Sequence, residues 1–141
     1  MNELIQILDS ENCSLVVSSD EVHTFFGRGV SDLFWLLGEK PVLLNGARIA
    51  DKVMGKGAAA LMVLGAVGEV YAQVISKPAL ALLEQAGIHV SYGTLVPNIV
   101  NREGTGMCPL EMRCMSCATA EECLTQIQAF MKEMSMKSCK G

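Results

Sequence analysis

The sequence predicts an α/β domain with a mixed sheet and helices on both faces of that sheet. Strand and helix patterns alternate over residues 43–92, and crossovers of a dozen or more residues favour parallel strand pairs. Two short apolar runs near the N-terminus flank a cluster of polar turn residues, which predicts an antiparallel hairpin. Half of the 141 residues are hydrophobic and 18% are charged, as is typical of a globular chain.

The N-terminal elements follow from short apolar runs and their flanking residues. Residues 2–10 fit an amphipathic helix, and residues 12–18 and 22–26 fit the two strands of the hairpin. Ser31 is expected to cap a second helix, which Gly38 and then a proline end.

The middle of the chain supplies the parallel part of the sheet. Its expected elements are strands over residues 43–50, 70–75 and 88–92 and helices over residues 56–67 and 76–87. The first of these helices is apolar nearly all round, so we expect it to be buried on most sides. In the second, Ser76 is the expected N-cap, Pro78 lies in the first turn, and Gly87 ends the helix.

The C-terminal part begins with a long irregular segment over residues 97–109, longer than a simple connector needs to be. A last amphipathic helix is expected from Thr119, where Glu122 completes a capping box. We therefore divide the chain into an α/β domain, residues 1–112, and a Cys- and Met-rich extension, residues 113–141, which packs on the same domain.

Charge and hydropathy exclude several classes of partner. The net charge of −4 gives no support for nucleic-acid binding, which requires a basic face. The longest apolar run, residues 57–68, is shorter than the roughly 20 residues that span a bilayer. We find no signal peptide and expect a cytoplasmic protein whose six cysteines are mainly reduced.

The first candidate site lies where a strand is expected to lead into the buried helix. Arg48, Asp51, Lys52 and Lys56 form the densest charge in this part of the chain. The free N–H groups at a helix start favour an anion, so this stretch predicts a small anionic ligand. No Ser or Thr follows Lys56, which argues against a magnesium-triphosphate loop. Alternatively, Asp51 caps the helix and the lysines are solvated.

The second candidate site is the run from Asn101 to Glu111. Arg102 can hold a carboxylate or phosphate through two hydrogen bonds. Cys108 and Glu111 are a nucleophile and a base in principle, although no histidine lies near them in the sequence. The alternative is an ordered loop with a half-buried thiol.

The third candidate is a Cys-x-x-Cys pair, Cys114 and Cys117, flanked by Cys108 and Cys123. A zinc or iron–sulfur site and a redox pair are both open interpretations, although zinc ribbons use two such pairs. The simpler alternative is reduced thiols, with Cys123 on the inner face of the last helix.

Four stretches together resemble an uncharacterised bacterial family. They are IADKVMGKGAA at residues 49–59, VISKPA at 74–79, LVP at 95–97 and NREGTGMCPLE at 101–111. This family of unknown function is placed in the cytidine-deaminase-like fold superfamily, and the resemblance covers about residues 1–112. It implies a three-layer sheet with helices on both faces, and no established activity.

Zinc deaminases carry His-x-Glu at the start of one helix and Pro-Cys-x-x-Cys at the start of the next. The corresponding positions here are Lys56-Gly57-Ala58 and Pro78-Ala79-Leu80-Ala81, which contain neither the zinc ligands nor the glutamate. The resemblance therefore implies no metal at the deaminase positions, and we expect no cofactor.

Three functional hypotheses result. The first is a zinc-free binding domain for a small anionic or nucleotide-like ligand, held between the Lys56 helix start and residues 101–111. The second is an enzyme of different chemistry that uses Asp51, Lys52 or Lys56 together with Cys108. The third is an interaction protein, or a metal- or redox-responsive one, that acts through the C-terminal cysteines. A homo-oligomer is left open.

Overall fold

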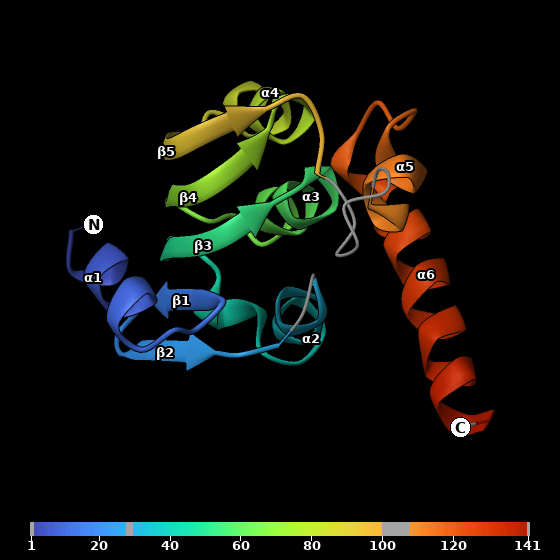
Figure 1. The fold of residues 1–141 in the computed structure, drawn as a ribbon, viewed down its shortest axis with the longest axis horizontal. Helices are drawn as coiled ribbons and strands as arrows, with labels where there is room; N and C mark the ends of the chain where they lie inside the picture. The colour runs from blue at the N-terminus through green and yellow to red at the C-terminus, as the bar shows by residue number, and fades with distance from the viewer. Residues whose placement is uncertain (1, 28–29, 100–107, 141) are drawn as a thin grey trace.

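A computed structural model describes residues 2–27, 30–99 and 108–140, with only the backbone for residues 134–140, and contains one mixed sheet (Figure 1). Its strands are β1 (Leu15–Ser18), β2 (Val22–Phe25), β3 (Arg48–Met54), β4 (Glu69–Ser76) and β5 (His89–Val96). They lie in the order β2-β1-β3-β4-β5. Strand β1 is antiparallel to β2 and β3, whereas β3, β4 and β5 are parallel. The predicted α/β class with a mixed sheet is confirmed.

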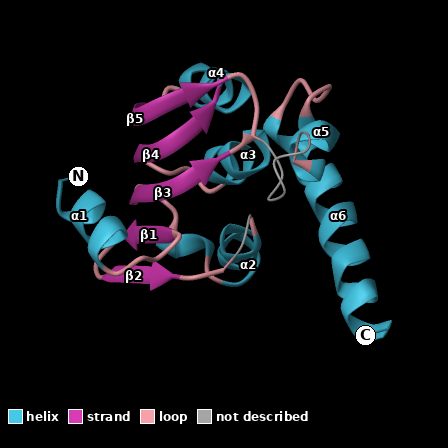
Figure 2. Cartoon of the chain, viewed as in Figure 1, coloured by secondary structure: helices cyan, strands magenta, loops and turns pink. Residues whose placement is uncertain are grey.

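Helices cover both faces of this sheet (Figure 2). They are α1 (Asn2–Ser10), α2 (Ser31–Glu39), α3 (Lys56–Leu64), α4 (Lys77–Gln85), α5 (Pro109–Cys114) and α6 (Ala120–Lys140), with a 3₁₀ helix at Pro41–Leu43. One face packs against α1, and the other faces the core that α2 to α6 share. None of the helices in the described ranges is long and apolar enough to cross a bilayer.

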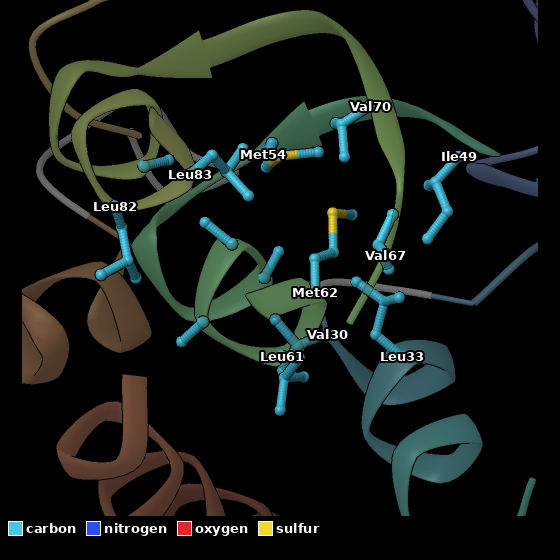
Figure 3. Packing of buried hydrophobic residues seen from close by; sticks show 14 of the residues in the cluster. Val30, Leu33, Ile49, Met54, Leu61, Met62, Val67, Val70, Leu82 and Leu83 are labelled. Carbon is cyan, nitrogen blue, oxygen red and sulfur yellow. The ribbon is translucent and has the colours of Figure 1, made fainter. Parts of the chain in front are cut away.

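The larger core lies between the sheet and the helices on one face (Figure 3). Ile49 and Val70 of the sheet and Leu61 and Met62 of α3 belong to this cluster, all four are fully buried, and Met62 points toward the sheet. The predicted burial of the apolar α3 is confirmed. Val16 points to the opposite face and joins the smaller cluster under α1, because side chains alternate along a strand.

Local signals in the sequence are borne out at several helix ends. The Ser76 hydroxyl accepts a hydrogen bond from the backbone N–H of Ala79 at 3.3 Å, as expected of an N-cap. Gly87 follows α4 with a φ of +77°, a conformation that glycine adopts without strain. Thr119 and Glu122 form the expected capping box, with distances of 3.2 and 3.3 Å.

Several expected boundaries were wrong: β5, for example, ends at Val96 and not at residue 92, and α3 ends at Leu64 and not at residue 67. The strand expected over residues 43–50 is β3, Arg48–Met54, because pairing with β1 and β4 fixes its register and Asp51 lies opposite Leu15 and Ala72. Asp51 and Lys52 therefore lie within the strand instead of in the turn before α3. Ser31 is also not the N-cap of α2: Val30 occupies that position.

Helix α5 was not expected, since residues 97–109 were treated as irregular and no element was assigned directly after them. Pro109 occupies its first turn, where the missing N–H and the fixed φ of proline are tolerated. This short helix brings Glu111 and Cys114 into the protein, where both are buried.

Candidate functional site

The polar centre of the molecule is the buried carboxylate of Glu111, which is 2% exposed. Its Oε1 accepts a hydrogen bond from the backbone N–H of Lys56 at 2.8 Å, at the start of α3. Its Oε2 accepts the backbone N–H of Ile99 at 2.7 Å. The Ser76 hydroxyl, at the start of α4, donates to Oε1 at 3.4 Å. One side chain thus joins the starts of two helices at the carboxyl ends of β3 and β4.

This carboxylate supplies what the start of α3 lacks. The N-cap of α3 is Gly55, which offers no side-chain acceptor to the free N–H groups of the first turn. A negative charge is favourable there because the helix dipole is positive at its N-terminus. A Cβ at Gly55 would lie 3.3 Å from Glu111 Oε1, so the absence of a side chain at Gly55 also allows the carboxylate to approach the start of α3 closely. The expected anion position at this helix start is therefore filled by the protein itself.

The side chain of Lys56 joins the start of α3 to the residues that follow α5. Its Nζ donates to the backbone carbonyl groups of Cys117 and, at 3.4 Å, Met115, which follow the end of α5. A cation is favourable at a helix C-terminus, where carbonyl groups lack partners. Lys56 is only 9% exposed, so its ammonium group faces the interior beside α5 and not an open cleft.

The other charged residues of the first candidate site lie elsewhere. Lys52 donates to Asn12 Oδ1 at 2.7 Å in an exposed pair. Arg48 is exposed at the start of β3, whereas Lys56 follows its end. The structure therefore does not gather the predicted charges at one place.

Asp51 lies in the middle of β3, on the same side of the strand as the buried Ile49. It is 8% exposed, and burial raises the pKa of its carboxyl from 3.8 to about 8, against the opposing effect of the backbone N–H groups of Val53 and Lys52. At neutral pH the Asp51 side chain is then mainly the neutral acid. The interpretation of Asp51 as the cap of α3 was wrong.

Of the second candidate site, Asn101 and Arg102 lie outside the described residues. Cys108 is half-buried against the main core and precedes α5. Its backbone N–H donates to the Ile99 carbonyl at 2.8 Å, which holds the chain beside Glu111.

The cysteines of the third candidate form a buried thiol cluster, which we define as Cys114, Cys117 and Cys123. Cys123, on α6, lies near enough to Cys114 and Cys117 to affect the pKa of both thiols, and the Cys117 thiol donates to the Arg113 carbonyl at 3.8 Å. Cys114 and Cys123 are fully buried, and Cys117 is half-buried. The ammonium group of Lys56 interacts electrostatically with all three.

The pKa values of the three thiols in the cluster are shifted in different directions. The adjacent Cys123 thiol lowers the pKa of the Cys114 thiol, against the effect of burial. The adjacent Cys114 thiol, together with burial, raises the pKa of Cys123. Burial raises the pKa of Cys117. Cys114 is therefore the most acidic thiol of the three.

Sequence reasoning identified Cys114 and Cys117 as a pair but did not predict that the thiol of Cys123 lies beside them. The only available signal was the helical spacing that turns Cys123 and Ile127 toward the core. Ser76 was recognised as a cap but not as a partner of Glu111. Within the parts of the chain that the structure describes, no group of three or more His, Cys, Asp or Glu residues could hold a metal ion.

The fold and these contacts define a class: an α/β domain whose adjoining helix starts are joined by an internal carboxylate and which carries a buried thiol cluster. The model of a family described as a domain of unknown function, DUF1893 (TM1506), matches residues 3–131. The chain belongs to the DUF1893 family. The match extends beyond residue 112, where we expected the family resemblance to end.

A solved structure supports the same relationship. The crystal structure of a DUF1893 family protein (TM1506) from Thermotoga maritima is similar, with a TM-score of 0.83 and 26% sequence identity. The similarity covers 91% of this chain and 87% of that one. No curated protein matches the sequence.

Proposed function

We propose that this protein is a thiol-based redox-responsive domain in which Cys114 and Cys117 form a reversible disulfide. The observation that carries the proposal is the thiol cluster itself, in which two buried thiols and one half-buried thiol lie beside the Lys56 ammonium group, which donates to the Cys117 carbonyl. Reactive cysteines lie near cations and combine a stabilised thiolate with some exposure. Cys114 supplies the thiolate, and the half-buried Cys117 supplies the exposure.

The backbone favours the Cys114–Cys117 pair. The N–H of Cys117 donates to the carbonyl of Cys114 at 3.0 Å and closes a turn. Such a turn brings the two Cα atoms within about 7 Å of one another, and disulfides join Cα atoms about 4.4 to 6.8 Å apart.

The oxidant in this proposal is a low-molecular-weight disulfide such as oxidised glutathione. The more exposed Cys117 thiol loses its proton to water and attacks one of its sulfur atoms, and a mixed disulfide forms as the first small thiol leaves. The thiolate of Cys114 then attacks the Cys117 sulfur, and the second small thiol leaves. The protein loses two electrons and two protons, the small disulfide gains them, and Cys123 stays reduced.

Peptide mapping tests this pairing directly. The protein is incubated with oxidised glutathione, alkylated and cleaved with a Glu-specific protease. Cleavage at Glu121 or Glu122 separates Cys123 from the other two thiols. We expect an internal disulfide in the Cys114–Cys117 peptide and alkylated Cys123. Disulfide-linked Cys123, or three alkylated thiols after oxidation, would refute the proposal.

Variants of Cys123 test the effect of its thiol on Cys114. Cys123→Ala removes this thiol, and we expect the closing step, in which Cys114 attacks Cys117, to slow because less of Cys114 is then thiolate. Cys123→Ser keeps a donor and is expected to react close to the wild-type rate. Equal rates for both variants would show that the contact does not activate Cys114. Stoichiometric zinc that protects all three thiols from alkylation would instead favour metal binding.

A reducing compartment suits this function, and we propose a cytoplasmic location on that ground. The thiols would rest in the reduced state and form the disulfide when the small-molecule disulfide pool rises.

We further propose that the fold is cytidine-deaminase-like and lacks the zinc reaction. Lys56-Gly57-Ala58 and Pro78-Ala79-Leu80-Ala81 lie at the starts of α3 and α4, where zinc deaminases carry their ligands. The carboxylate of Glu111 lies at both helix starts in this protein. Cytidine deamination by the zinc-supplemented protein would contradict this proposal.

Binding of a small anion is the second candidate function. Its support is the convergence of three donors, the N–H groups of Lys56 and Ile99 and the hydroxyl of Ser76, on one carboxylate. An external carboxylate or phosphate would have to displace Glu111. A thermal-shift screen over nucleotides and anions tests this with a Glu111→Ala variant. A ligand that raises the melting temperature of the wild type supports anion binding. If acetate stabilises only the Glu111→Ala variant, the site is structural and is occupied by Glu111 in the wild type.

A further inference from the structure

A groove between α2 and α6 lies outside all of the candidate sites. Its volume is about 560 Å³, within the range of about 300 to 1,000 Å³ for small-molecule sites. Trp35, Gly38 and Glu39 line it from α2, and Leu124, Gln128 and Met131 line it from α6. Leu124 and Met131 also pack against the main core, so the groove has an apolar floor.

The sequence explains why a hollow lies here. Trp35 and Glu39 are four residues apart on α2 and therefore share one face of the helix. Gly38 lies between them without a side chain, and a Cβ added there would meet no atom within 4 Å. Leu124, Gln128 and Met131 are likewise spaced to share one face of α6. Trp35 is 49% exposed, so much of its indole is available for contact.

The charge of the groove selects the class of ligand. Glu39 is the only charged side chain among the described residues that line it, and the neighbouring Lys40 and Lys132 are not part of the lining. A carboxylate repels anions, and the face of an indole ring attracts a cation. We propose that this groove binds an organic cation with an apolar body, such as an aromatic or alkyl ammonium compound.

Trp35 provides the readout, because it is the only tryptophan in the chain. Three probes of similar size are titrated at constant ionic strength: benzyltrimethylammonium, benzyl alcohol and benzoate. We expect benzyltrimethylammonium to change the fluorescence saturably, with a dissociation constant about tenfold lower than that of benzyl alcohol. Benzoate is expected to bind more weakly than either. Non-saturating quenching, or equal binding of all three probes, would overturn the proposal.

Two variants link the signal to the groove. Gly38→Leu fills the hollow and is expected to abolish saturable binding, while Glu39→Gln is expected to weaken benzyltrimethylammonium binding about tenfold and benzyl alcohol binding little. Glu84→Gln, an exposed residue of α4, is the matched control and should bind like the wild type. Melting curves identify any variant that fails to fold. Unchanged binding by a folded Gly38→Leu protein would place the probe elsewhere.

Discussion

The buried carboxyl of Asp51 leads to a prediction about stability. Its pKa is 3.8 in the unfolded reference and about 8 in the folded protein, because burial disfavours the charged form. The native state therefore binds more protons than the unfolded state between these values, so the free energy of unfolding falls as the pH rises. Each unit corresponds to about 1.4 kcal/mol, which gives up to about 6 kcal/mol between pH 4 and pH 8. A typical domain has only about 5 to 15 kcal/mol in total.

Asp51→Asn removes this titration while it keeps the size and polarity of the side chain. We expect the wild type and the variant to have similar stability near pH 4, and the variant to gain about 1.4 kcal/mol per unit up to about pH 8. Above that pH the difference should be constant. Urea unfolding under reducing conditions measures this difference, in which the shared titration of the thiols cancels.

The matched control is Asp20→Asn, the same substitution at an exposed position outside the core. A wild-type minus Asp51→Asn difference that stays flat between about pH 5 and pH 9 would show that the folded protein tolerates the Asp51 carboxylate, and the reasoning from burial would then be refuted.

Three further predictions concern the elements around the core, each measured by urea unfolding. Glu111→Gln should lower the free energy of unfolding by about 1 to 3 kcal/mol, because its amide group turns a donor toward one of the two backbone N–H groups. An unchanged urea midpoint would show that these hydrogen bonds do not stabilise the fold. Gly65→Ala should cost about 1 to 3 kcal/mol, since its Cβ would lie 2.8 Å from Leu44 Cδ1, whereas Gly38→Ala should gain about 0.5 to 1 kcal/mol. The reverse order would disprove the packing argument. Thr119→Ala should cost about 1 kcal/mol through the lost cap of α6, and no loss would show that the cap is not needed.

Much of the fold follows from the sequence because its signals are local. The polar turn residues between two apolar runs predicted the hairpin, Ser76 and Pro78 marked the start of α4, and the apolar sequence after Lys56 predicted a buried helix. Each signal depends on residues only a few positions apart, whose spacing determines whether a helix or a strand buries its apolar side.

The candidate site required the tertiary structure. Glu111 is 55 residues from Lys56 and 35 from Ser76, and no local pattern indicates that a carboxylate will occupy a distant helix start. The range of β3 was predicted wrongly for the same reason. Pairing with β1 and β4, and not local propensity, puts Asp51 inside the strand.

The sequence by itself determined the α/β class, the order along the chain of the strands and of the helices other than α5, and the presence of a Cys-x-x-Cys pair. Only the tertiary structure decided that Cys123 joins this pair, that Lys56 faces the interior, and that the helix start carries its own anion. The physical reason is that periodicity reports which side of an element is buried, whereas hydrogen bonds between distant residues form only after the sheet and its helices have packed.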